Sequence, residues 1–126
     1  MPTHEATRAT TRDTIQTYFD QLYAGGWESL IADDIVFVGP SGTTRSKAAY
    51  VEGTNRFKRV AKSVEVRQLL VDGESACAVT HYTLQSPKGN TSVCDVAEIL
   101  AVKDGKLAAS TIFFDTAAFG EFMAQG

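Results

Sequence analysis

The sequence predicts an α+β domain in which helices come mostly first and an antiparallel sheet follows. Apolar residues in the first half recur at helical spacing, whereas the second half contains four apolar runs separated by short polar turns. The predicted order is helix, helix, strand, helix and then four consecutive antiparallel strands. An antiparallel sheet of this kind must curve strongly to bury one face, and the three helices are available to cover it.

The longest predicted element is a β-hairpin between Thr91 and Asp115. Its apolar arms, Val93–Val102 and Leu107–Phe114, flank an Asp104-Gly105 pair. Asp-Gly between apolar runs is a strong hairpin signal, because glycine adopts the positive φ that tight hairpin turns require. Each arm would span roughly 30 Å, enough to curl across a small domain.

A first helix is predicted to end at Gly25-Gly26, with residues 1–12 frayed before it. The apolar face of this helix consists of Ile15, Tyr18, Phe19, Leu22 and Tyr23. A second short helix begins at Trp27 and ends at the acidic pair Asp33-Asp34. The strand Ile35–Val38 follows, and residues 39–42 are expected to form a loop.

Ser46 is the predicted N-cap of a third helix, whose apolar face includes Tyr50 and Phe57. Two strands follow, Val64–Val71 and Ala76–Gln85, joined by a turn at residues 72–74. After the long hairpin, Phe119, Phe122 and Met123 return to helical spacing and predict a closing helix.

Length and charge restrict the class of protein. The 126 residues form one predicted domain, 1–126, and the net charge of −3 argues against nucleic acid as a partner. No apolar run is long enough to span a membrane, and the polar N-terminus lacks a signal-peptide core, so we expect a cytoplasmic protein. Cys77 and Cys94 fit reduced thiols, and the cysteines and histidines match no zinc spacing. No metal or cofactor is expected.

Three local patterns resemble the nuclear-transport-factor-2-like superfamily and especially its SnoaL-like members. They are IQTYFDQLYAGGWESL-IADDIVFVGPSG (Ile15–Gly42), VAEILAVKDGKL (Val96–Leu107) and the closing strand Ile112–Asp115. The resemblance implies a cone, also described as a cystatin-like α+β roll, in which the curved sheet wraps around the helices and leaves an internal apolar pocket. It further implies a small, largely apolar ligand and a homodimer formed through the outer face of the sheet. Apolar residues on both faces of the hairpin independently favour a partner subunit.

The resemblance also bears on individual residues. Tyr18 matches the tyrosine that donates a hydrogen bond to an oxyanion in ketosteroid isomerase, and Glu98 is the best match for that enzyme's neutral acidic residue. Gly39 stands where ketosteroid isomerase has its catalytic base, and Ile112 stands where limonene-epoxide hydrolase has an aspartate. A ketosteroid isomerase reaction is therefore disfavoured.

His81 is the remaining candidate for acid–base chemistry. Counting back through the hairpin places it on the pocket face, near either Glu98 or Asp95, and the resemblance favours Glu98. The hypothesis is a His81–Glu98 pair facing Tyr18, since a carboxylate beside an imidazole favours its charged form. The expected ligand-binding residues are Phe37, Tyr50, Phe57, Thr83, Ile112 and Phe114.

Two functions remain open from the sequence. The first is binding of a small apolar molecule with cofactor-free acid–base catalysis of the isomerase, cyclase, dehydratase or hydrolase type. The second is a non-catalytic ligand-binding or dimerisation module of the same fold. The presence of His81 with a nearby carboxylate favours the first, whereas the missing base at Gly39 and the missing acid at Ile112 favour the second.

Overall fold

The computed structural model describes residues 3–125 as an α+β fold with one six-stranded, strongly curved sheet. The helices in this part of the chain are α1 (His4–Gln21), the short 3₁₀ helix η1 (Trp27–Leu30), α2 (Lys47–Phe57) and α3 (Thr116–Ala124). The strands are β1 (Ile31–Gly39), β2 (Gly42–Thr44), β3 (Ala61–Asp72), β4 (Ser75–Gln85), β5 (Thr91–Lys103) and β6 (Lys106–Phe114). Their order across the sheet is β2-β1-β6-β5-β4-β3.

The four consecutive antiparallel strands predicted from the sequence are β3 to β6. The hairpin of β5 and β6 closes at the predicted place, where Lys103 pairs with Lys106. Asp104 and Gly105 both have positive φ, 52° and 73°, as a two-residue hairpin turn of the primed type requires. β1 then runs parallel to β6, and β2 continues from β1 as a short hairpin where the sequence predicted only a loop.

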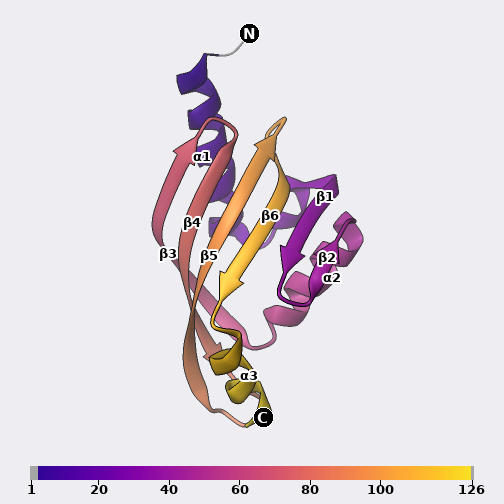
Figure 1. Ribbon diagram of the computed structural model, residues 1–126, viewed down its shortest axis with the longest axis vertical. Coiled ribbons are helices and arrows are strands. Elements are labelled where there is room, and N and C mark those ends of the chain that lie inside the picture. The colour runs from indigo at the N-terminus through magenta and orange to yellow at the C-terminus, as the bar shows by residue number, and fades with distance from the viewer. Residues whose placement is uncertain (1–2, 126) are drawn as a thin grey trace.

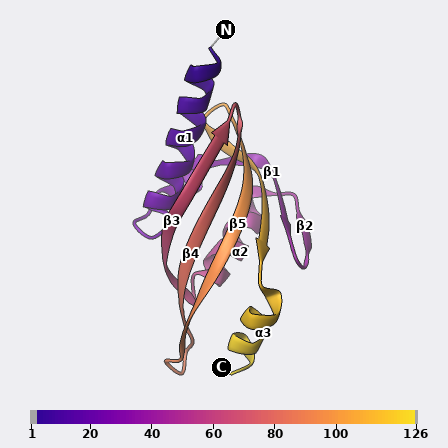
Figure 2. The same cartoon turned by 60° about the vertical axis from the view of Figure 1, so that its left-hand side comes forward.

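The curvature of the sheet has a local cause in β3. The register shifts between Val66 and Gln68, so Arg67 is an extra residue opposite β4. A β-bulge bends its strand and reverses which residues face inward. Partly buried positions accordingly alternate through Val64 and Val66 before the bulge and through Leu69 and Val71 after it. The bend lets the sheet curl around the helices (Figures 1 and 2).

Helix α1 is longer at its N-terminus than predicted. The expectation that residues 1–12 are frayed is wrong for the described part, because the helix begins at His4 with Thr3 as its N-cap. The side chain of Thr11 is 1% exposed, and its hydroxyl donates to the Gly73 carbonyl at 2.7 Å. The turn between β3 and β4 therefore fixes the early turns of α1, a long-range contact that helical periodicity does not reveal.

We expect replacement of Thr11 with valine to lower the free energy of unfolding by about 1 kcal/mol, because the partly buried Gly73 carbonyl loses its donor. Valine keeps the shape of the side chain, so the change isolates the hydrogen bond. Urea unfolding at neutral pH measures the difference. Thr10→Val, on the exposed side of the same helix, is the matched control and should change stability by less than about 0.5 kcal/mol.

The remaining helices begin where side chains cap them. The Ser46 side chain accepts from the Ala49 N–H at 3.1 Å, confirming the predicted N-cap of α2. Asp115 caps α3 in the same way, accepting from the Ala118 N–H at 3.0 Å. None of the helices in the described range is long and apolar enough to cross a membrane.

Two hydrophobic clusters fill the interior. The larger packs α1, with Ile15 and Phe19, against η1 and the upper sheet, including Ile31 and Leu107. The smaller gathers around Phe122 of α3 at the other end of the sheet. The space between these clusters is the cavity described next.

Candidate functional site

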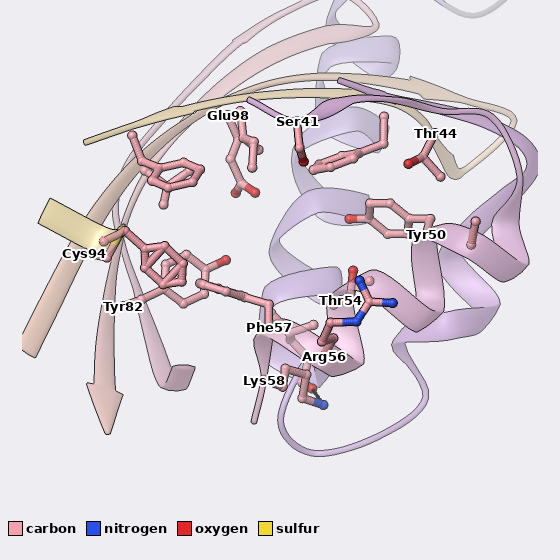
Figure 3. A pocket seen from close by; sticks show the side chains of 18 of the residues that line it. Ser41, Thr44, Tyr50, Thr54, Arg56, Phe57, Lys58, Tyr82, Cys94 and Glu98 are labelled. Carbon is pink, nitrogen blue, oxygen red and sulfur yellow. Dashed lines mark hydrogen bonds between the residues drawn. The ribbon is translucent and has the colours of Figure 1, made fainter. Parts of the chain in front are cut away.

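A cavity of about 270 Å³ lies on the inner side of the sheet, bounded by α1, α2 and α3 (Figure 3). Strand β5 contributes every second residue to its wall, because alternate side chains of a strand point to the same face. Most of the wall is apolar or aromatic. The apolar and aromatic lining residues are Tyr18, Leu22, Phe37, Ala49, Tyr50, Phe57, Tyr82, Val96, Ile112, Phe114 and Phe119.

Glu98 is the acidic residue in this wall. It projects from β5 into the cavity, and its side chain is mostly buried, with the residue 8% exposed (Figure 3). Its Oε2 atom has no hydrogen-bond partner. Burial raises the pKa of Glu98 from 4.5 to about 8, because removal from water disfavours the carboxylate. At neutral pH the side chain is therefore mainly a carboxylic acid and can donate a hydrogen bond.

Three tyrosines surround Glu98. The hydroxyls of Tyr18 and Tyr50 lie 2.8 Å apart in a buried hydrogen bond that joins α1 to α2. Burial raises the pKa of Tyr18, Tyr50 and Tyr82, and the nearby Glu98 carboxyl raises all three further. The tyrosines thus remain neutral, and the inner end of the cavity carries hydroxyl donors beside a neutral acid.

Polar and basic groups lie on the α2 side of the cavity. Thr54, Arg56 and Lys58 belong to the last turn of α2 and its C-cap, and Ser41 and Thr44 come from the β1–β2 hairpin (Figure 3). The cavity therefore has a neutral acid on its sheet side and basic side chains on its helix side, with aromatic walls between them.

The predicted His81–Glu98 pair is wrong. His81 lies on the outer face of β4, opposite Asp95 in the register, whereas Glu98 pairs with Ala78. The His81 Nδ1 and Asp95 Oδ1 atoms are 2.6 Å apart, so the histidine has the alternative partner that the sequence left open. Alternate residues of a strand point to opposite faces. The observed register differs by three residues, an odd number, from the one that would pair His81 with Glu98, so the two side chains lie on opposite faces of the sheet.

Most other predicted positions lie in the cavity wall. Tyr18, Glu98, Phe37, Tyr50, Phe57, Ile112 and Phe114 are all lining residues. Thr83 is an exception: it shares the outer face of β4 with His81 and is exposed. Contact between any of these residues and a ligand stays a prediction.

Sequence reasoning missed Tyr82, Cys94, Thr54, Arg56 and Lys58 as lining residues. A signal for Tyr82 was present. The even positions of β4, from Ala76 to Leu84, include its largest apolar side chains, whereas the odd positions end in Ser75 and Gln85. That asymmetry favours the even positions as the buried face. The basic residues gave no such signal, because helix periodicity alone suggests a solvent-exposed face.

Within residues 3–125, no group of three or more histidine, cysteine, aspartate or glutamate side chains is arranged to hold a metal ion. The thiols of Cys77 and Cys94 are both free. Cys94 lines the cavity, and partial burial raises its pKa.

A curved sheet closed by helices around an interior cavity defines an α+β cone fold. The sequence matches the profile of the SnoaL-like domain over residues 15–110, so the chain belongs to the SnoaL-like family of the nuclear-transport-factor-2-like superfamily. A search of curated proteins finds no match.

Solved structures agree with this fold. TerC, co-crystallised with polyporic acid, is similar with a TM-score of 0.79 and 20% identity, over 91% of this chain and 98% of that one. A candidate SnoaL-like polyketide cyclase from Jannaschia sp. CCS1 has a TM-score of 0.82 and 14% identity, over 95% of each chain. A candidate ketosteroid isomerase from Kribbella flavida has a TM-score of 0.74 and 24% identity, over 86% of this chain and 79% of that one. At these levels of sequence identity, the similarities show a shared fold and nothing further about function.

Proposed function

We propose that this protein binds a small, largely apolar carbonyl compound in the cavity and that the neutral Glu98 carboxyl donates a hydrogen bond to the carbonyl oxygen. The supporting observation is the unpartnered Oε2 of Glu98, buried on the sheet side of a wall that is mostly apolar and aromatic. A buried polar atom without a partner is costly, so a ligand that supplies an acceptor is stabilised there. TerC, a protein of the same fold, was co-crystallised with polyporic acid, so this fold accommodates a ligand in at least one case.

The same group would also supply acid–base catalysis. A carboxyl with a pKa of about 8 is close to the operating pH, where a general acid is most effective. Donation to a carbonyl oxygen stabilises the negative charge that develops there during enolisation. The proposed chemistry is thus transfer of the α-proton next to the carbonyl to a water molecule or hydroxide from solvent, because Gly39 stands where a catalytic base would be. Return of the proton at another carbon would make the reaction an isomerisation, and loss of a leaving group would make it a lyase reaction, in either case without a cofactor. We further propose a cytoplasmic protein whose cysteines are reduced.

Binding tests the proposal directly. We expect 2-acetylnaphthalene, a neutral aromatic ketone, to bind more tightly at about pH 6 than at about pH 9.5, by roughly tenfold, because the ionised Glu98 can no longer donate. Fluorescence titration at the two pH values measures the affinities.

Glu98→Leu is the matched variant for this experiment. Leucine is apolar and of similar length, so it should bind the ketone more weakly at pH 6 and with no pH dependence. Equal affinity of the wild-type protein at both pH values would exclude hydrogen-bond donation by Glu98.

The alternative, a non-catalytic binding or dimerisation module, has one specific observation in its favour. The outer face of the sheet exposes apolar side chains on neighbouring strands, with Leu70 56%, Ile99 52% and Phe113 57% exposed. The register places Leu70 opposite Cys77 and Cys77 opposite Ile99, so the exposed residues form one continuous surface. A second copy of the chain would cover it, as expected from the sequence.

We expect the protein to sediment as a dimer at micromolar concentration and Ile99→Lys to shift it to the monomer, since a charge would be buried in the interface. Met123→Lys, at an exposed apolar position on α3, is the control and should remain dimeric. A monomeric wild-type protein in analytical ultracentrifugation would disprove the dimer without affecting the cavity proposal.

A further inference from the structure

The charge of the cavity differs in sign from the charge of the whole chain. The protein carries a net charge of −3. Among the described residues that line the cavity, the charged side chains at neutral pH are Arg56 and Lys58, because Glu98 is held mainly neutral by burial. A cation at a binding site in an acidic protein requires a specific explanation.

Arg56 is placed to make a further interaction. Its Nη2 atom lies 3.2 Å from Glu52 Oε1, one turn earlier on α2, and the two side chains are 65% and 75% exposed. An exposed ion pair at this spacing is weak and exchanges with solvent. It engages one edge of a guanidinium that has five N–H donors, which leaves donors for a second anion.

Lys58 has a different role. Its ammonium donates to the Leu22 carbonyl and lies 5.2 Å from the ring centroid of Tyr23 and 5.7 Å from that of Trp27. These contacts hold the side chain between α2 and the end of α1. It therefore adds a fixed positive charge beside the cavity, whereas Arg56 keeps the freedom to reach a ligand.

We infer that the ligand is an organic anion, a flat carbonyl compound with a carboxylate at the end remote from Glu98, and that Arg56 binds this carboxylate. The inference rests on the proposed function, which places the carbonyl at Glu98. Glu98 lies on the sheet side and Arg56 on the α2 side, with aromatic walls between them (Figure 3). Guanidinium and carboxylate match in a bidentate geometry, which makes Arg56 a determinant of specificity.

Two probes that share a ring system test this inference: 6-acetyl-2-naphthoate, which carries the carboxylate, and 2-acetylnaphthalene, which does not. We expect the wild-type protein to bind the carboxylate about tenfold more tightly at pH 6 and low salt. Arg56→Gln should remove most of this preference, because the carboxylate of 6-acetyl-2-naphthoate loses its partner. Added salt should reduce the preference in the wild-type protein, because part of the guanidinium is exposed to solvent.

Arg59→Gln is the matched control. Arg59 is an exposed arginine three residues after Arg56 and does not line the cavity, so the variant has the same loss of charge and should keep the preference. Equal binding of the two probes by the wild-type protein would overturn the anion inference and leave the carbonyl site in place. A preference that survives Arg56→Gln would also overturn the role of Arg56. Failure of both probes to bind would instead overturn the proposed function.

Discussion

Replacing Glu98 with glutamine is expected to abolish most of the loss of stability that the wild-type protein should show as the pH rises from about 5 to about 9. In the folded protein, burial raises the pKa of Glu98 to about 8 from its ordinary value of 4.5. The unfolded chain releases this proton near the ordinary value, so between these limits the folded state binds one more proton. Raising the pH therefore favours unfolding. The stabilising contribution of the protonated Glu98 is complete below the pKa of the unfolded state, and it is lost once the pH exceeds the pKa of the folded state.

The magnitude is large for one side chain. A separation of this size between the two pKa values corresponds to a difference on the order of 5 kcal/mol, comparable with the whole stability of a small domain. Glutamine has the same shape and no titratable proton, so the Glu98→Gln protein should be the more stable of the two at about pH 9. Urea unfolding at a series of pH values measures both curves.

Asp95→Asn provides the control. Asp95 is an exposed carboxylate on the outer face of the same strand, so the amide variant should retain the alkaline decline of the wild type. Parallel stability curves for the wild-type and Glu98→Gln proteins from pH 5 to 9 would show that Glu98 is ionised normally in the folded state. That result would contradict the proposed function, which depends on a neutral Glu98 carboxyl as the hydrogen-bond donor.

The sequence predicted the sheet well because its signals are local. Asp104-Gly105 determines a turn by its own backbone preference, and this turn sets the pairing of β5 with β6 next to it, up to the register shift between Ala101 and Val102. Ser46 likewise caps α2 through a contact three residues away. The early turns of α1 depend instead on the contact between Thr11 and Gly73, 62 residues apart, which no local pattern contains.

The site was harder to predict because the faces of β4 are decided by tertiary packing. Val79 and Ala78 are both apolar, so alternation next to His81 is ambiguous, and only the larger side chains of Tyr82 and Leu84 favour the even positions as the buried face. Glu98 was placed in the pocket by the resemblance to ketosteroid isomerase, and in the structure it is buried on the same face of β5 as Val96 and Leu100. The raised pKa of its carboxyl depends on the helices that exclude water from it, and this effect is visible only in the assembled fold.

The second large effect concerns catalysis. We expect the wild-type protein to accelerate exchange of the α-hydrogens of 2-tetralone with deuterium oxide, and Glu98→Leu to reduce this acceleration by a factor of 10² or more. Deuterium oxide or deuteroxide removes the α-hydrogen, the carbonyl oxygen gains negative charge, and the neutral Glu98 carboxyl would stabilise that charge in a mostly apolar wall. Proton NMR of the ketone at about pH 7 measures the rate. The acceleration should fall as the pH rises through about 8, where the donor loses its proton.

His81 distinguishes this mechanism from the one expected at first. Its imidazole lies against Asp95 on the outer face of the sheet and does not reach the cavity, so His81→Ala should exchange 2-tetralone at close to the wild-type rate. If His81→Ala lost exchange activity while circular dichroism showed an intact fold, His81 would have to take part in the mechanism. Exchange no faster with the wild-type protein than with Glu98→Leu would leave a protein that binds its ligand without transforming it. The cavity would then bind a carbonyl group without catalysis. The comparison of the wild-type protein with Glu98→Leu therefore decides between an enzyme and a binding module.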